Sequence, residues 1–247
     1  MDRKRILVTG SSRGIGRAIA FRLSRDGWDV ALHYVSDGDE AERTHASLGK
    51  HAAGLYSSDL SNPGSAAKLI KSALADGPIH AIVNNAGVYM PIDFTKSGDA
   101  AFQANYHRTF AVNFESPMFI TRAILDHFHK NKGGKILNVA SRVGFRGEGG
   151  ASLYAASKAA LINLTRSLAV ELAPSNIQLF AVAPGWVDTA MAREGMRERL
   201  DDILAGIPLG RMASPEDVAA VAAFLLSPEA SYLSGTAVDI NGASYFH

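Results

Sequence analysis

The sequence predicts an α/β protein whose parallel β-sheet is covered by helices on both faces. Short apolar runs rich in β-branched residues alternate along the chain with longer segments of helical character. The runs, such as KILNVAS at 135–141, are almost uninterrupted, as expected for strands buried on both faces. Because a chain of 247 residues can bury one sizeable core, we expect residues 1–247 to form a single domain.

The expected elements follow one another in alternating order. Strands are expected at 5–10, 28–34, 52–59, 79–85, 135–141, 177–185 and 236–242. Helices are expected at 15–26, 64–75, 105–130, 152–173 and 215–227. Ser214 and Pro215 mark the start of the last helix, because serine caps free amide groups and proline suits the first helical position.

The composition argues against several classes of protein. The 25 basic and 24 acidic residues leave a net charge of +1 without a basic cluster, so we expect no nucleic-acid partner. The chain has no cysteine, and its eight histidines form no group typical of a metal site. No stretch approaches the ~20 apolar residues of a membrane span, and the apolar run near the start is too short for a signal peptide. We expect a cytoplasmic protein without a bound metal.

A glycine-rich turn, TGSSRGIG at 9–16, follows the first expected strand and opens the first helix. Gly10, Gly14 and Gly16 would let the backbone turn tightly and approach a ligand, and amide groups at a helix N-terminus bind phosphate. The spacing G-x-x-x-G-x-G differs from the general dinucleotide motif, but its position and mechanism agree with that motif. A turn that only packs the helix against the strand is the alternative.

Tyr154 and Lys158 lie four residues apart in LYAASKAAL at 153–161, a stretch that favours helix. Residues i and i+4 share a helix face, so the two side chains are neighbours. A phenol titrates near about 10 and exchanges protons poorly at neutral pH unless a cation stabilises the phenolate. Lys158 can supply that cation. Taken alone, such a pair is more often an ordinary feature of a helix surface.

Five motifs in order along the chain closely resemble those of the short-chain dehydrogenase/reductase family. They are TGSSRGIG at 9–16, NNAG at 84–87, Ser141 after a strand, YAASK at 154–158 and PG at 184–185. The likeness runs from Arg5 to DING at 239–242. It implies a Rossmann fold with seven parallel strands in the order 3-2-1-4-5-6-7, and an oxidoreductase that uses a nicotinamide cofactor.

The resemblance implies four catalytic residues. Tyr154 would be the general acid that protonates a carbonyl oxygen, and the base in the reverse oxidation. Lys158 would lower the pKa of Tyr154 and hold the nicotinamide ribose. Ser141 would bond the substrate oxygen, and Asn113 would position a water in a proton relay. Ser141 as a turn cap and Asn113 as an ordinary helix amide are the alternatives, because the preceding segment 95–108 is longer than the family's usual one.

The resemblance also implies a cofactor cradle at the ends of several strands. Asp59 would contact the adenine ring, and Thr189 the nicotinamide carboxamide. Each has an alternative role as a helix cap. The full expected set is Gly10, Ser12, Arg13, Gly14, Ile15, Gly16, Tyr34, Ser36, Asp59, Leu60, Asn85, Ala86, Gly87, Tyr154, Lys158, Pro184, Gly185, Val187 and Thr189.

The charge at the end of the second strand predicts NADP(H) as the cofactor. An acid there binds the ribose hydroxyls of NAD, whereas a 2′-phosphate is repelled by an acid and attracted by arginine. Tyr34 occupies the acid's place, Arg13 lies in the glycine turn, and Ser36 is a further phosphate donor. If the register differs by a few residues, Asp37 becomes the ribose acid and NAD the cofactor.

The overall match is most similar to the 3-oxoacyl-carrier-protein reductase branch, which predicts NADPH-dependent reduction of a 3-oxoacyl thioester or related ketone. VYMP at 88–91 departs from that branch and argues against delivery by a carrier protein. NAD-dependent dehydrogenation of an alcohol, sugar or polyol is the close alternative. A catalytically silent NAD(P)-binding sensor is the distant one, because such relatives commonly lack the tyrosine or lysine.

Residues 186–212 are expected to close over the substrate as a specificity loop. The apolar side chains of this loop favour a hydrophobic or mixed ketone, although they could equally form an amphipathic lid helix. They include Trp186, Met191, Met196 and Leu200.

Relatives are usually tetramers, so a homotetramer or homodimer is expected, with helices 105–130 and 152–173 paired between subunits. The sequence ALINLTRSLAVEL at 160–172 is apolar on more than one face, which agrees with a helix buried against both a sheet and a partner. A monomer with a larger core is the alternative.

Overall fold

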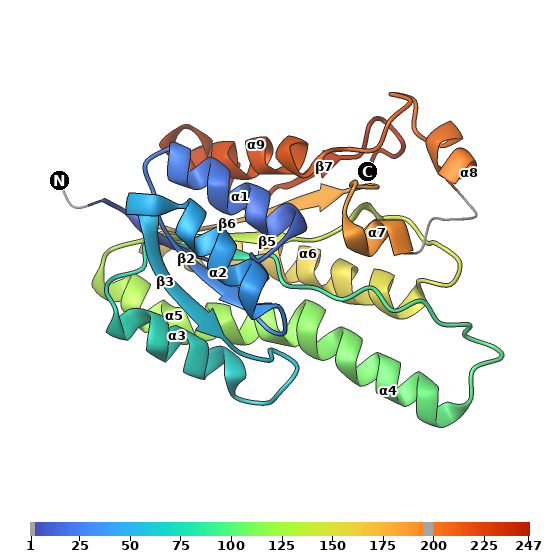
Figure 1. Cartoon of the computed structure of the whole chain (residues 1–247), viewed down its shortest axis with the longest axis horizontal. Coiled ribbons are helices and arrows are strands. Elements are labelled where there is room, and N and C mark those ends of the chain that lie inside the picture. Colours follow the sequence, from blue (N-terminus) through green and yellow to red (C-terminus); the bar gives the residue numbers. More distant parts are fainter. Residues whose placement is uncertain (1–2, 195–199) are drawn as a thin grey trace.

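The computed structural model describes residues 3–194 and 200–247, and within these ranges it is built around a seven-stranded parallel sheet (Figure 1). The strands lie in the order β3-β2-β1-β4-β5-β6-β7, which confirms the expected class and strand order. Every expected run overlaps a strand. The bounds are β1 Arg5–Val8, β2 Asp29–Tyr34, β3 Ala52–Ser57, β4 Ala81–Asn84, β5 Gly134–Val139, β6 Ile177–Pro184 and β7 Ala237–Ile240.

Helices cover both faces of the sheet, as Figure 1 shows. The α-helices are α1 Gly14–Arg25, α2 Gly38–Ser47, α3 Ser65–Ala75, α4 Asp99–Phe110, α5 Ser116–Lys130, α6 Ser152–Leu172, α7 Ala190–Glu194, α8 Leu200–Ala205 and α9 Pro215–Leu226. The shorter helical turns are η1 Gly49–His51, η2 Ala111–Glu115, η3 Arg142–Gly144, η4 Ala173–Ser175 and η5 Pro228–Leu233. None of the helices in the described ranges has the length and apolarity needed to cross a bilayer.

Alternate residues along a strand point into two separate hydrophobic cores, one on each face of the sheet. Ile6 and Val8 of β1 pack with side chains of α1 and α9, whereas Leu7 between them packs with α3, α5 and α6 on the opposite face. Successive side chains of a strand point to opposite faces, so a strand without polar residues must be covered on both sides. This explains why the strand runs read as almost uninterrupted apolar sequence.

The long helix before β5 begins earlier than expected. Its start was predicted at 105, but α4 begins at Asp99 and continues through the π-helical turn η2 into α5. Gly98 supplies an extended N-cap and Asp99 an acid in the first turn. The unusually long segment 95–108 therefore mainly adds helical turns to the element that carries Asn113.

Helix α2 was not anticipated, although its sequence contains a start signal. Asp37 caps it by accepting a hydrogen bond from the amide of Glu40 at 3.2 Å, and two acids lie in its first turn. The expected cap of α9 is confirmed as a reciprocal capping box between Ser214 and Asp217. Two short helices, α7 and α8, occupy half of the described part of the expected specificity loop.

A buried arginine ties the amino-terminal end of the sheet together. Arg5 on β1 is 7% exposed, and its guanidinium donates to the carbonyl oxygens of Ala53, Ala73 and Gly77 at 2.6 to 3.0 Å and to the Tyr56 hydroxyl at 2.7 Å. These bonds join β1 to β3 and to the end of α3. Loss of the guanidinium would leave several buried carbonyl groups without partners.

We predict that Arg5→Met lowers the free energy of unfolding by about 3 kcal/mol, because buried acceptors lose a charged donor. Chemical denaturation measures the difference. Arg3→Met is the matched control: Arg3 lies at the same end of the chain, but it forms only a half-exposed ion pair with Asp29 and should change the stability little. Equal losses in both variants would contradict the structural role of Arg5.

Candidate active site

A cleft of about 860 Å³ opens at the carboxyl end of the sheet, where the loops of parallel strands meet. Nearly all of the expected site residues line it, although they come from segments far apart in the sequence. They are Gly10, Ser12, Arg13, Gly14, Ile15, Tyr34, Ser36, Asp59, Leu60, Asn85, Ala86, Gly87, Ser141, Tyr154, Lys158, Pro184, Gly185, Val187 and Thr189. The two expected residues that do not line it are Gly16 and Asn113.

The glycine turn presents a helix N-terminus to the cleft. Gly10 and Gly14 have φ of +61° and +57°, a region that glycine adopts without a side-chain clash. Arg13 holds the N-cap position of α1 in extended conformation, and its side chain makes no capping hydrogen bond. The first amide groups of α1 are therefore not blocked by a cap, and the turn fits a phosphate of a dinucleotide.

Gly16 has a packing role, and its expected contact with the cofactor stays a prediction. A Cβ atom there would lie 2.3 Å from the Gly10 oxygen and 2.4 Å from Nδ2 of Asn85. The same Asn85 amide donates to the carbonyl oxygens of Thr9 and Gly10 at 2.9 Å. Gly16 thus lets α1 approach the turn closely, one layer below the cleft.

The end of the cleft where adenosine is expected to bind lies beyond β2 and β3. Tyr34 is the last residue of β2, as the expected register requires, and Asp37 follows at the cap of α2. Asp59 accepts hydrogen bonds from the Ser61 amide at 2.9 Å and the Ser61 hydroxyl at 2.7 Å, and these bonds lower the pKa of its carboxyl. Because the N-cap of α3 is Gly64, Asp59 forms a local turn and does not cap that helix.

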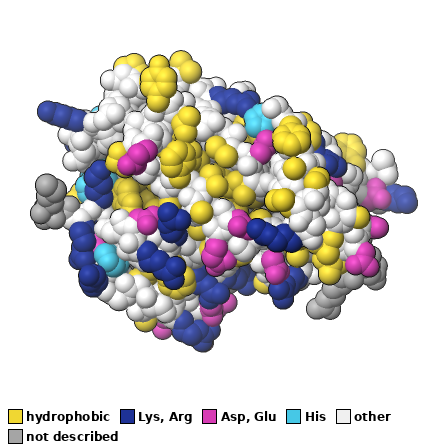
Figure 2. All heavy atoms as spheres, turned by 90° about the horizontal axis from the view of Figure 1, so that it is seen from above, with side chains coloured by type: hydrophobic (Ala, Val, Ile, Leu, Met, Phe, Trp, Pro, Cys, Tyr) yellow, Lys and Arg dark blue, Asp and Glu magenta, His cyan; other side chains and the backbone are white. Residues whose placement is uncertain are grey.

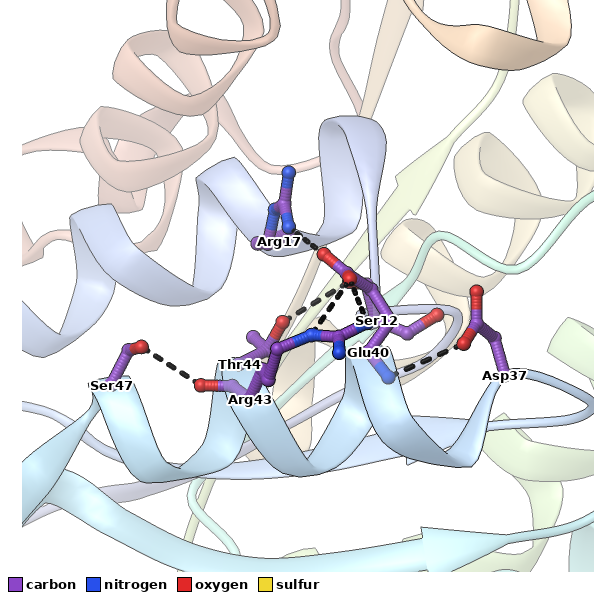
Figure 3. A network of polar contacts seen from close by, with 7 residues as sticks. All are labelled: Ser12, Arg17, Asp37, Glu40, Arg43, Thr44 and Ser47. Carbon is purple, nitrogen blue, oxygen red and sulfur yellow. Dashed lines mark hydrogen bonds and ion pairs between the residues drawn. The ribbon is translucent and has the colours of Figure 1, made fainter.

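Near α2, the Glu40 carboxylate pairs with two arginines, but Arg13 in the glycine turn is paired with no carboxylate of the described residues. Figure 3 shows Glu40 between Arg17 of α1 and Arg43 of α2, pairing with both guanidinium groups. The hydrogen bond from Arg43 is the main reason why the pKa of Glu40 is lowered. Arg13, which is exposed and lines the cleft, has no ion pair with any described residue.

Helix α6 places Tyr154 and Lys158 at the other end of the cleft. Lys158 is 4% exposed, and its Nζ donates to the Val139 oxygen at 2.8 Å while lying 5.8 Å from the centre of the Tyr154 ring. The Ser141 hydroxyl accepts a long bond from the Val143 amide at 3.4 Å, so Ser141 caps η3 and also faces the cleft. The three catalytic side chains expected at the cleft therefore come together.

Burial moves the pKa values of the pair in opposite directions. Removal from water raises the pKa of Tyr154 to about 12; hydrogen bonding to Ser141 opposes this shift, and the Glu148 carboxylate reinforces it. Burial also lowers the pKa of Lys158 to about 8. Desolvation of the phenol is therefore the largest influence on the Tyr154 pKa, and the Lys158 ammonium is hydrogen-bonded to the Val139 oxygen; a lowering of the Tyr154 pKa by Lys158 stays a prediction.

Asn113 lies behind the cleft on the π-helical turn η2. Its Oδ1 accepts from the Val88 amide at 2.8 Å, and its Nδ2 donates to the Val88 oxygen at 2.9 Å and the Ser157 hydroxyl at 3.3 Å. A Cβ atom on Gly87 would lie 3.3 Å from Asn113 Oδ1 and 3.6 Å from Lys158 Nζ. Both Asn113 and Lys158 therefore lie close to Gly87; the part of Asn113 in a proton relay stays a prediction.

Other residues of the site were not singled out in the sequence. Tyr89 packs edge to face against Tyr154, with ring centres 5.1 Å apart, and it belongs to the VYMP segment that departs from the related branch. Arg142 and Glu148 form an ion pair at 3.5 Å and also line the cleft. The position of Arg142 directly after Ser141 was a signal that could have identified it.

In the described part of the specificity loop, some side chains line the cleft and others form a small apolar cluster of their own. Trp186 and Met191 line the cleft, Leu200 does not, and Met196 lies outside the described residues. Trp186 also packs with Ile203 and other apolar side chains, which agrees with an amphipathic helical lid. Thr189 accepts from the Ala192 amide at 3.3 Å, so it caps α7 and lines the cleft at once.

The chain is similar to a large family of curated proteins along its whole length. A family model described as enoyl-(acyl carrier protein) reductase matches residues 10–243. The 3-oxoacyl-[acyl-carrier-protein] reductase of Aquifex aeolicus is 38% identical, with coverage of 97% of this chain and 96% of that protein. The same-named enzyme of Vibrio cholerae is 33% identical (99% and 98%), and the acetoacetyl-CoA reductase of Allochromatium vinosum is 32% identical (98% and 98%).

Solved structures show the same likeness. A blue fluorescent protein from a metagenomic library, in complex with NADPH, is 31% identical with a TM-score of 0.90 and 98% coverage of both chains. The 3-ketoacyl-(acyl-carrier-protein) reductase of Brucella melitensis with NADH is 30% identical, with a TM-score of 0.89 and the same coverage. A putative NAD(P)-dependent gluconate 5-dehydrogenase of Beutenbergia cavernae with NADP is 32% identical, with a TM-score of 0.88 and coverage of 98% and 96%. The chain therefore belongs to the short-chain dehydrogenase/reductase family, and it is an oxidoreductase that acts on C=O and CH–OH groups.

Proposed function

We propose that the protein is an NADPH-dependent carbonyl reductase that converts a 3-oxoacyl thioester or related ketone to the 3-hydroxy product. The observation that carries the proposal is the placement of Ser141, Tyr154 and Lys158 at one end of a cleft whose other end is a glycine turn. Relatives named as 3-oxoacyl-carrier-protein and acetoacetyl-CoA reductases support the substrate class. A silent sensor is disfavoured, because the chain retains the complete proton-transfer set.

The cofactor would be held along the whole cleft. The amide groups of the glycine turn suit its phosphates, Gly87 leaves space for a ribose against the backbone, and the Lys158 ammonium suits ribose hydroxyls. A nicotinamide supplies hydride when it is bound. Everything else in the reaction is the task of this chain's own side chains.

Tyr154 holds the proton that the substrate oxygen needs. Its raised pKa keeps the phenol protonated at neutral pH, so it is set to donate from Oη to an oxygen on which negative charge develops. The Ser141 hydroxyl donates to the same oxygen, and the Lys158 cation stabilises the phenolate left after proton transfer. The edge of Tyr89 fixes the plane of the Tyr154 ring.

Charge supports NADP(H) over NAD(H). Tyr34 stands at the end of β2 where an acid would bind ribose hydroxyls, and Arg13 is exposed and lines the same cleft. Ser36 also lines this end. Asp37 is engaged as the cap of α2, which weakens its candidacy as the ribose acid. A solved relative with bound NADH keeps NAD as the alternative.

The substrate end combines apolar and polar groups. Trp186 and Met191 offer apolar contact, and the Arg142–Glu148 pair adds charge near Tyr154. Tyr89 lies where the related branch has a different sequence, so we propose a free acyl thioester or ketone as substrate, without a carrier protein. The dehydrogenation of an alcohol or sugar is the second candidate, supported by the likeness to a gluconate 5-dehydrogenase.

We also propose that the protein forms a homotetramer or homodimer through its long helices. Large apolar side chains are exposed on α4, α5 and α6, including Tyr106, Phe119 and Val170, which is 80% exposed. A further band of apolar side chains crosses the face seen in Figure 2. Phe224 of α9 and Leu233 of η5 are also exposed apolar side chains. Light scattering of the purified protein tests the assembly.

Tyr154→Phe should reduce ketone reduction by at least about a thousandfold while leaving the affinity for NADPH unchanged, because only the proton donor is removed. The measurement is steady-state reduction of a panel of 3-oxo thioesters and ketones, together with a binding titration. Substantial residual activity would exclude Tyr154 as the acid.

Activity should fall as the pH rises through about 8, because Lys158 loses its charge near that value while Tyr154 stays protonated. Because the pKa of Lys158 is lowered to about 8, its side chain is fully protonated only well below pH 8. Lys158→Arg should be much less active but should lack the decline near 8, since arginine stays charged. A decline that persists in Lys158→Arg would assign the titration to another group.

Arg13→Ala should weaken NADPH binding by about tenfold and NADH binding little, because only NADPH carries the 2′-phosphate. Fluorescence titrations with both dinucleotides measure this. Arg43→Ala is the matched control: Arg43 is an exposed arginine paired with Glu40, and it does not line the cleft. Equal losses for both dinucleotides in Arg13→Ala would remove Arg13 from the phosphate site.

A further inference from the structure

His33 lies directly beneath the glycine turn, yet it is not among the described residues that line the cleft. It is the second-last residue of β2, and its exposed fraction is 0%. A fully buried imidazole needs partners for both of its ring nitrogens. Both partners belong to segments that form the cofactor cleft, so their identity decides what the histidine does.

The two ring nitrogens contact two different walls of the cleft. The Gly10 amide donates to Nδ1 at 3.2 Å, and Nε2 lies 2.9 Å from the Ser58 oxygen. A carbonyl oxygen can only accept, so Nε2 must carry the hydrogen and Nδ1 must present its lone pair. The geometry therefore requires a neutral ring in a single tautomer.

The environment of the ring favours this neutral state. Burial lowers the pKa of His33, and the hydrogen bond to Ser58 and the nearby Asp59 carboxylate oppose that shift without overcoming it. Protonation of Nδ1 would place two donors against each other at Gly10. The neutral form is thus the one that holds the turn at neutral pH.

The backbone of His33 is joined to the same turn. The Ser11 amide donates to the His33 oxygen at 2.9 Å, and the His33 amide donates to the Ser11 hydroxyl at 3.1 Å. On its other side Gly10 packs closely on Ala86, where a Cβ atom on the glycine would lie 2.9 Å from the Ala86 Cα. Gly10 is therefore fixed between β2 and the loop after β4.

We propose that His33 is a positioning residue for the dinucleotide: one neutral imidazole sets the glycine turn that receives phosphate and the end of β3 that leads to Asp59. The proposal rests on the nicotinamide cofactor of the proposed function, but not on the choice between NADPH and NADH. It concerns both walls of the adenosine half, because Ser58 directly precedes Asp59 and Gly10 opens the turn.

The chain contains a matched control at the opposite end of β1. Nδ1 of His80 accepts the Arg5 amide at 3.0 Å, the same kind of bond that Gly10 makes with His33, but His80 lies at the amino-terminal end of the sheet and does not line the cleft. Its pKa is also lowered, with burial as the largest cause. A variant that lacks the His80 bond to the Arg5 amide shows whether losing a histidine–backbone hydrogen bond far from the cleft is enough to weaken dinucleotide binding.

The experiment measures the dissociation constants of NADPH and NADH by fluorescence for the wild type, His33→Leu, His33→Asn and His80→Leu, with stability followed by chemical denaturation. We expect His33→Leu to weaken both dinucleotides by about tenfold or more. His33→Asn keeps an acceptor near the position of Nδ1 but loses the bond to the Ser58 oxygen, so its affinities should lie between those of the wild type and His33→Leu. His80→Leu should lose stability but keep the wild-type affinities.

Two results would overturn the proposal. One is an unchanged affinity in folded His33→Leu; the other is an equal loss of affinity in His80→Leu, which would point to general destabilisation. If His33→Leu does not fold, nitrogen NMR of the wild-type imidazole decides instead: a neutral ring protonated on Nε2 supports the role, and a charged ring or the other tautomer contradicts it. Failure of the wild type to bind either dinucleotide would instead remove the proposed function.

Discussion

The site depends on how closely the backbone after β1 approaches the backbone after β4. The Thr9 hydroxyl accepts from the amides of Asn85 and Ala86 at 3.0 Å, and the Asn85 side chain returns bonds to the oxygens of Thr9 and Gly10. Gly10 leaves no space for a Cβ atom against Ala86. These contacts lock two strand ends together at the point where the sheet's carboxyl edge becomes a ligand surface.

Burial determines the chemistry at the far end of the cleft. A phenol and an ammonium on one face of α6 are both withdrawn from water, and each is thereby shifted toward its uncharged form. The phenol therefore holds its proton firmly at neutral pH, whereas the ammonium is close enough to neutrality to respond to pH. The carbonyl oxygen of Val139 anchors the Lys158 ammonium by a hydrogen bond without supplying a compensating charge.

The two ends of the cleft are built by different means. The glycine turn is shaped by backbone conformation and held by the buried His33 and by the Asn85 side chain, which also lines the cleft. At the other end, helical spacing on α6 makes Tyr154 and Lys158 neighbours, and Ser141 joins them from the turn after β5. A π-helical turn in the adjoining helix brings Asn113 behind Gly87, so that a carboxamide fully bonded to Val88 supports the wall of the site.

Local sequence properties determined the class of fold, the glycine turn and the Tyr154–Lys158 pair, because apolar periodicity, turn glycines and helical spacing are local. The resemblance to the short-chain dehydrogenase/reductase family supplied the strand order and most of the other site residues. Asp37 and the acids after it would also have marked α2, since a helix cap is local. Only the tertiary structure decided that Gly16 packs against Gly10 and that Asn113 bonds to Val88 and Ser157 without lining the cleft. It also decided the direction of the Tyr154 pKa shift and the anchoring of Gly10 by His33, because burial and contacts between distant strands do not exist until the whole chain has folded.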